Sequence, residues 1–140
     1  MNIHFNIHRN VLIYIDYSLD ISTQKNINWR KQTLKPVIKN FKDHSNPVLG
    51  TKDGVPTVVS LYHDHEPGES STHHEHDWEH QAFITRGSGI LWVDGEEYSV
   101  STGDFVLVPP NSSHYFKNTG ASTLSRVTFN PTRSEEFLSP

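Results

Sequence analysis

The 140-residue chain is predicted to fold as an all-β domain preceded by an N-terminal extension. From about Thr57 onward, short segments rich in Val, Ile, Phe, Tyr and Thr alternate with clusters of Gly, Pro, Asn, Asp and Ser. Hydrophobic residues in this part lack the spacing of an amphipathic helix. Short strands separated by such turns are typical of a β-sandwich, a jelly roll or a small barrel.

The expected strands follow one another closely. They span residues 57–66, 80–86, 90–93, 96–100, 105–108, 114–118 and 123–130. Asp94-Gly95 predicts a type I′ hairpin, because both central residues of that turn need positive φ. Pro109 and Pro110 follow the apolar segment 105–108, at a place where no ladder hydrogen bond is needed. Because that segment is apolar throughout, we expect it to be buried on both faces.

The extension comprises residues 1–45, and the barrel domain is expected to comprise residues 46–140. Apolar residues alternate with other residues at Ile3, Phe5 and Ile7 and again over residues 11–21. This period of two favours a β-strand. Two interpretations stay open: an arm that adds a strand to this sheet or to that of a partner subunit, and a poorly ordered extension.

The composition excludes several classes of function. The formal net charge is −4 and no basic run is present, which argues against a nucleic-acid partner. The longest apolar run, residues 11–15, is too short to cross a bilayer, and the start of the chain does not resemble a signal peptide, so we expect a cytoplasmic protein without a membrane partner. Cysteine is absent, and any metal must therefore be bound by imidazole or carboxylate. Neither a GxSxG elbow nor a glycine-rich phosphate loop is found.

Histidine is the one residue type in excess, and residues 72–80 read THHEHDWEH. In a strand, residues two apart point to the same face, so His74 and His76 can approach one ion together. His80 follows a bend expected near Asp77, and His114 opens a later strand. Imidazole ligands suit a divalent Mn, Fe, Co, Ni, Cu or Zn ion. A histidine-rich surface loop without a specific site is the alternative.

Two ordered motifs run through this part of the chain. The first consists of Gly68, His74, His76, His80 and Gly87, and the second of Gly103, Pro109, His114 and Asn118. Together they resemble the two motifs of the cupin superfamily, over about residues 48–130. The resemblance implies a double-stranded β-helix, the cupin or jelly-roll barrel, with a metal ion inside its mouth and a homodimer as the assembly.

The first motif departs from the family pattern at His80, where cupins usually have glutamate. The resemblance therefore points to a four-histidine subset of cupins, with one divalent transition metal ion per chain bound by His74, His76, His80 and His114. Glu79 is adjacent, but neighbouring residues of a strand face opposite sides, so we expect Glu79 to point outward.

The same parity argument predicts the walls of a pocket beside the metal. Ala82 and Ile84 follow His80 on its face, and Phe116 follows His114, so we expect an apolar lining. His63 and His65 lie near the mouth, either as rim residues, which we favour, or as acid/base groups of the pocket.

Three neighbours receive other roles. His73 has the wrong parity to join His74 and is predicted to face outward. Trp78 is expected to pack beneath the metal loop rather than to form a platform for substrate. Arg86 is either an anchor for a substrate carboxylate or a surface arginine beside a turn, and we favour the surface.

The sequence thus favours a metal-dependent enzyme, of oxygenase or isomerase type, acting on a small chelating organic molecule. Four neutral ligands leave the ion its full charge, so it would be a stronger Lewis acid than one bound by a carboxylate. A non-catalytic cupin that binds or senses a small ligand is the alternative, because fold does not settle function. Metal buffering by the many histidines is a weaker hypothesis.

Overall fold

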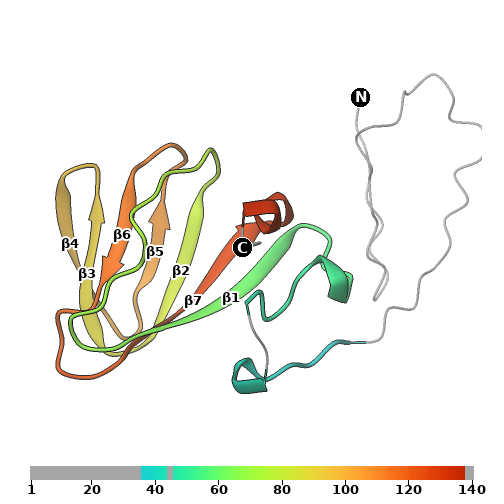
Figure 1. The fold of residues 1–140 in the computed structure, drawn as a ribbon, viewed down its shortest axis with the longest axis horizontal. Helices are drawn as coiled ribbons and strands as arrows, with labels where there is room; N and C mark the ends of the chain where they lie inside the picture. The colour runs from blue at the N-terminus through green and yellow to red at the C-terminus, as the bar shows by residue number, and fades with distance from the viewer. Residues whose placement is uncertain (1–35, 44–45, 138–140) are drawn as a thin grey trace, which may run out of the picture. The chain divides into compact units, whose positions relative to one another are not determined.

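A computed structural model of the chain describes residues 36–43 and 46–137 (Figure 1). The alternating segment of residues 3–21 lies outside the described residues, and its role as an added strand stays a prediction. The division between extension and barrel at residue 45 also stays a prediction.

The barrel consists of two antiparallel sheets that face each other (Figure 1). The first has the order β1-β7-β2-β5 and the second the order β4-β3-β6. Their strands are β1 (Val58–His65), β2 (His80–Arg86), β3 (Ser88–Val93), β4 (Glu96–Ser101), β5 (Phe105–Val108), β6 (His114–Lys117) and β7 (Leu124–Pro131). This is the jelly-roll architecture, and the predicted fold class is confirmed.

The observed strands agree with the expected ones to within two residues at each end. β2 and β5 have the predicted bounds. The largest difference is at β3, which begins at Ser88 rather than at residue 90. Gly89 lies outside the predicted strand, but in the structure it pairs with Val100. An added Cβ there would lie 2.3 Å from the carbonyl oxygen of Lys117, so close strand packing explains this glycine.

The core lies between the inner faces of the two sheets, where alternate residues of each strand point inward. Val59 and Leu61 of β1 are buried in this way. One continuous apolar cluster joins both sheets, and it contains Ala82, Ile84, Leu91, Val100, Val108, Phe116 and Leu124. This core sets the spacing of the strands whose ends carry the histidines.

The expectation that β5 is buried on both faces is wrong. Phe105 is 81% exposed and Leu107 is 62% exposed, whereas Val108 is fully buried. β5 is an edge strand with a single neighbour, β2, and its outer side chains have no second layer to cover them. Phe105 instead packs against Phe83 of β2, with 4.5 Å between the ring centroids.

The turns have the predicted backbone chemistry. Asp94 and Gly95 both have positive φ, 46° and 99°, as a type I′ hairpin requires. Asn111, which stands where the cupin motif usually has glycine, also has positive φ, 59°. Gly87 has φ of 77°, and a Cβ there would lie 2.4 Å from the carbonyl oxygen of Thr123, so no other residue fits.

Among the described residues, three short 3-10 helices flank the sheets: η2 (Phe41–Asp43), η3 (Thr51–Asp53) and η4 (Thr132–Phe137). The ring of Phe41 stacks on Tyr62 of β1, with 3.8 Å between centroids. Asn46 pairs with the backbone of Tyr62 through both ends of its amide. Within the part of the chain that the structure describes, no helix has the length and apolar character needed to cross a membrane.

Candidate metal centre

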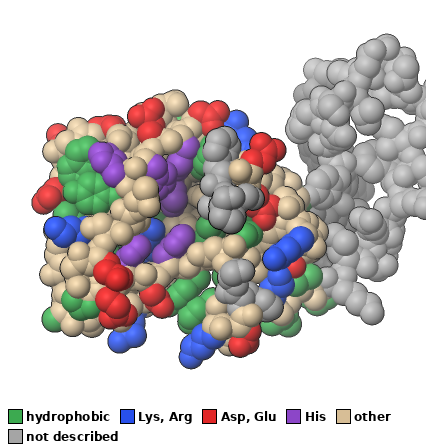
Figure 2. All heavy atoms as spheres, in the orientation of Figure 1, with side chains coloured by type: hydrophobic (Ala, Val, Ile, Leu, Met, Phe, Trp, Pro, Cys, Tyr) green, Lys and Arg blue, Asp and Glu red, His purple; other side chains and the backbone are tan. Residues whose placement is uncertain are grey.

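Four histidines from three parts of the chain converge at one end of the barrel. Their ligand atoms all lie within 4.8 Å of one another, and the four residues are His74, His76, His80 and His114. His80 and His114 are buried at the starts of β2 and β6, His76 is half-buried, and His74 is exposed. Figure 2 shows histidine side chains reaching the surface on one face of the domain. The cluster is therefore open to solvent on one side.

Backbone pairing holds the segment 72–80 in place. His74 forms an isolated bridge with His114, with N···O distances of 3.2 and 2.9 Å in the two directions. The amide of Asn111 donates to the carbonyl oxygen of His76 at 2.7 Å. His74 and His76 thus lie in an extended segment outside the regular strands, but their side chains share one side as predicted.

Hydrogen bonds to backbone carbonyls orient three of the rings. The Nδ1 atoms of His74, His76 and His114 lie 2.7–2.8 Å from backbone carbonyl oxygens. Because a carbonyl oxygen can only accept a hydrogen bond, each Nδ1 carries a proton and donates it. This sets the tautomer and leaves the Nε2 lone pair of each ring free for a ligand. A histidine whose second nitrogen donates to a carbonyl is the usual arrangement around a protein-bound metal.

The spacing of the nitrogens also fits an ion. His80 Nδ1 and His76 Nε2 are 3.4 Å apart. This separation lies within the 4.8 Å over which the ligand atoms of the four residues converge. In the described part of the chain, the Nε2 atoms of His80 and His114 are buried and have no hydrogen-bond partner. The orphan Nε2 of His114 is expected where a metal completes the site. His80 can offer either Nδ1 or Nε2 to an ion, but not both.

The electrostatics of the cluster favour neutral rings. Burial lowers the pKa of His80 to about 2 and also lowers the pKa of His76 and His114. Neighbouring histidines lower the pKa of each further, because one positive ring disfavours another. Neutral imidazole is the form that binds a metal ion.

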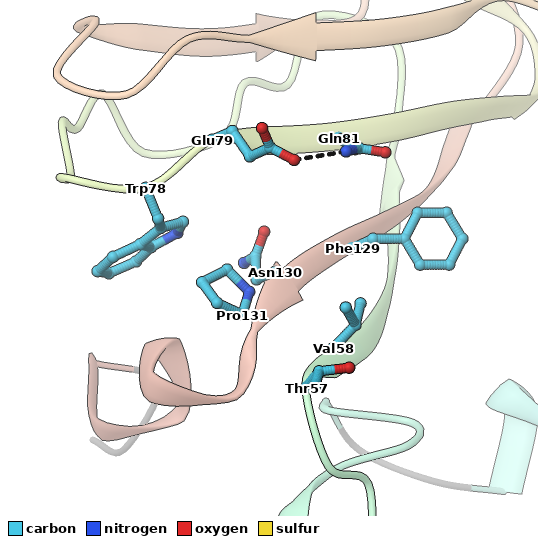
Figure 3. Close-up of a pocket in the computed structure, with 8 residues that line it drawn as sticks. All are labelled: Thr57, Val58, Trp78, Glu79, Gln81, Phe129, Asn130 and Pro131. Atoms are coloured by element: carbon cyan, nitrogen blue, oxygen red, sulfur yellow. Dashed lines mark hydrogen bonds between the residues drawn. The ribbon is translucent and has the colours of Figure 1, made fainter. Parts of the chain in front are cut away.

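Glu79 does not join the cluster. It is exposed, and its Oε1 accepts a hydrogen bond from Gln81 Nε2 at 2.6 Å. Figure 3 shows both side chains beside a hollow of about 260 Å³ that is lined by residues of β1, β2 and β7 and by none of the four histidines. Strand parity, which separates Glu79 from His80, therefore holds in the structure.

Trp78 and His73 support the segment from either side. The Trp78 ring is buried and stacks on His76 with 4.3 Å between centroids and 5° between planes, so it packs under the metal loop as expected. Arg133 covers Trp78 and pairs with Asp77. His73 faces away from the cluster, where its Nε2 is hydrogen-bonded to Ser113 Oγ at 2.7 Å.

The residues predicted to line a pocket fall into two groups. Ala82, Ile84 and Phe116 are at most 2% exposed and belong to the core cluster, so they share the inner face with the histidines but are packed. His63 and His65 are half-buried on the inner face of β1. Burial lowers the pKa of His63 to about 3. Their contact with a ligand stays a prediction.

Arg126 is the inner-face residue that the sequence analysis missed. It lies on β7, is 3% exposed, and donates a hydrogen bond to His65. Its position among Leu124, Thr128 and Asn130, which are also buried on β7, was the available signal. A charged residue at an inward position of a predicted strand is rare unless it has a partner.

Residues 61–129 match the family model of the cupin domain. These residues of the barrel form a cupin domain. Two solved structures share its fold. The polyketide cyclase RemF from Streptomyces resistomycificus is 25% identical with a TM-score of 0.57, covering 61% of this chain and 62% of that one. A cupin 2 domain-containing protein from Halorhodospira halophila is 24% identical with a TM-score of 0.57, covering 60% of each chain.

Two curated relatives match parts of this cupin. A 5-nitrosalicylic acid 1,2-dioxygenase from Bradyrhizobium is 41% identical over 72 residues, which are 51% of this chain and 33% of the relative. An uncharacterized protein from Aquifex aeolicus is 29% identical over 59 residues, 42% of this chain and 47% of that one. This chain thus spans a third to a half of the length of the curated relatives it matches.

The last residue of the second cupin motif, Asn118, has a structural role. It is fully buried, and its Nδ2 donates to the carbonyl oxygens of His65 and Ser122 at 2.7 and 2.9 Å. Its Oδ1 accepts from the amide of Gly120 at 2.9 Å. One side chain thereby ties the end of β1 to the turn before β7, which explains why the motif ends in an amide.

Proposed function

We propose that this cupin domain binds one divalent transition metal ion through His74, His76, His80 and His114 and acts as a metal-dependent enzyme. The reaction is of oxygenase or isomerase type, and the substrate is a small organic molecule that chelates the ion. The observation that carries the proposal is the cluster of four rings, three of which are oriented by backbone carbonyls so that Nε2 is free.

An ion bound there would supply a Lewis acid with open coordination positions. The four ligands are neutral, and Glu79 points away from them. An oxyanion of the substrate is therefore favoured at the ion. The exposed side of the cluster, at His74, is the side from which a substrate can approach.

The relatives support this class of chemistry without deciding the reaction. The sequence match to a 5-nitrosalicylic acid 1,2-dioxygenase supports an oxygenase, and the structural likeness to a polyketide cyclase supports a reaction other than oxygenation. We favour the oxygenase, because 41% identity lies well above 25%.

Ligand binding without turnover is the second candidate. In the described part of the chain, no carboxylate is hydrogen-bonded to any of the four histidines, so the cluster has no built-in acid/base partner. A sensor or binding cupin needs none.

Metal analysis and a turnover assay together test the proposal. Protein purified without chelator should contain one ion per chain, and the His76→Ala variant should lose it. With Mn or Fe added, dioxygen consumption or product formation is measured across salicylates, catechols, diketones and thiols. His73→Ala, which removes a neighbouring histidine outside the cluster, should leave both metal content and turnover unchanged.

A wild-type protein that contains no metal would refute the proposal. The second candidate, ligand binding without turnover, would be favoured by a protein that contains one ion per chain and shows ligand-induced thermal shifts but no turnover of any of these compounds. More than one tightly bound ion per chain would instead support the hypothesis that the histidines buffer metal ions.

A further inference from the structure

Arg126 lies between the two sheets, on the inner face of β7. In the sheet register it stands opposite His63 of β1 and Ile84 of β2, and residues opposite each other share a face. Its guanidinium carbon lies 4.3 Å from the ring centroid of Phe116, which belongs to β6 in the other sheet. The side chain therefore crosses the interior of the barrel, and only 3% of it is exposed.

The hydrogen-bond partners of Arg126 leave its charge uncompensated. One terminal N–H group donates to His65 Nε2, and Nε has no partner. Among residues 36–43 and 46–137, the ion pairs are Lys39 with Asp53 and Arg133 with Asp77, and none involves Arg126. Arginine has no acceptor atoms, so His65 must be the acceptor and is neutral. A neutral ring satisfies one N–H group but cancels no charge.

A buried charge of this kind is unfavourable without an anion. Removing an unpaired ion from water carries a large free-energy cost, even after relaxation of the protein. Burial lowers the pKa of Arg126 only to about 10, so the guanidinium keeps its charge at neutral pH. Stacking on Phe116 occupies the flat face of the group and leaves its N–H edge available. That edge is the part that binds carboxylates through two parallel hydrogen bonds.

Arg126 is also close to the histidine cluster. Phe116, which it contacts, follows His114 by two residues on β6, so both side chains lie on the inner face. The positive charge of Arg126 contributes to lowering the pKa of His80, His114 and His63. A metal ion in the cluster would add a second positive charge to the same interior, and the described residues there supply no negative one.

We infer that Arg126 binds the carboxylate of a small organic acid whose other oxygen atoms reach the histidine cluster. This inference names the substrate class for the site under Proposed function and rests on that proposal for the metal half of the contact. His65 is a positioning residue, because its Nε2 holds one N–H group of the guanidinium and directs the rest of the edge. His65 is half-buried, so the ring that contacts the guanidinium itself reaches solvent.

A carboxylate fits this place better than a phosphate does. One guanidinium balances one negative charge, whereas a phosphate monoester carries about −1.5 to −2 at neutral pH. Two of the surrounding side chains, Ile84 and Phe116, are apolar. His63, which stands opposite Arg126, offers one N–H donor while its ring is neutral, so donors for a third anionic oxygen are few.

The first test uses the wild-type protein and two probes of one shape. Salicylate and salicylamide differ in charge at the carboxyl position, and binding of each is measured by calorimetry before and after metal removal with EDTA. We expect salicylate to bind at least tenfold tighter in both states. Equal affinities in the EDTA-treated protein would overturn the inference. The measurement on the EDTA-treated protein needs no metal, so it tests the role of Arg126 even if the protein proves to bind no metal ion.

The second test assigns the preference to Arg126. In Arg126→Met, which keeps the length of the side chain, the tenfold preference should vanish, and Arg126→Lys should retain part of it. Arg86→Met removes an exposed arginine of β2 and is the matched control, with the preference unchanged. A preference that survives in a folded Arg126→Met protein refutes the inference. If that variant does not fold, the wild-type comparison and Arg126→Lys decide.

Inorganic phosphate is the third probe. We expect it to compete with salicylate at least tenfold more weakly than benzoate does in the EDTA-treated protein. Tighter competition by phosphate would overturn the assignment to carboxylates.

Discussion

Removal of the proposed metal ion should destabilise the barrel by an amount that can be estimated. Without an ion, the buried Nε2 atoms of His80 and His114 have no partner. Each unsatisfied buried group costs about 1–3 kcal/mol. An ion at a concentration one hundred times its Kd stabilises the folded state by about 2.7 kcal/mol. In a domain of this size, 1 kcal/mol shifts Tm by about 4–8 °C, so the loaded protein should melt about 10–20 °C above the metal-free protein.

The assay is thermal unfolding followed by circular dichroism, with and without EDTA, and with metal content measured on the same samples. His76→Ala should abolish most of the metal-dependent shift, because it removes one of four ligands. His73→Ala should retain the full shift, because that ring is hydrogen-bonded to Ser113 outside the cluster. A loaded wild-type protein whose Tm does not change on metal removal would refute the reasoning. Equal losses in both variants would refute the assignment of ligands.

Three further predictions concern the fold around the site. Burial lowers the folded-state pKa of His63 to about 3 from an unfolded value near 6.5, so the unfolded chain binds more protons between these values. The contribution of His63 to the free energy of unfolding of the EDTA-treated protein should therefore be fully present above pH 6.5 and be lost as the pH falls toward 3. In urea unfolding, His63→Gln should reduce the pH dependence of this free energy by at most about 1.4 kcal/mol per pH unit. Asn118→Ala should cost roughly 2–5 kcal/mol in urea unfolding, because three buried hydrogen bonds lose their partner, whereas a loss below about 1 kcal/mol would contradict the tie it forms. The homodimer stays a prediction: sedimentation should show two copies for the wild type and one for the double variant Phe105→Glu, Leu107→Glu, which charges the exposed face of edge strand β5, and a wild-type monomer would contradict it.

Much of the fold and of the candidate site could be predicted from local patterns. Strand position depends on the alternation of apolar residues and on turn residues such as Asp94-Gly95, and both are visible in the sequence. The same alternation separated His80 from Glu79, and the structure places Glu79 outside the cluster. His114 was added by the second motif rather than by any pattern near residues 72–80, and the structure brings it together with the other three histidines.

Tertiary structure alone decided which apolar and charged residues are covered. The run from Phe105 to Val108 predicted burial on both faces, but a strand is buried on both faces only if layers lie on each side of it, and β5 is at an edge. Arg126 has no local signature, because its environment comes from β1, β2 and β6, which are distant in sequence. Alternation along one strand therefore determined which side each residue faces. The closure of the two sheets determined that the side of Arg126 also holds the histidines and that no described carboxylate pairs with Arg126.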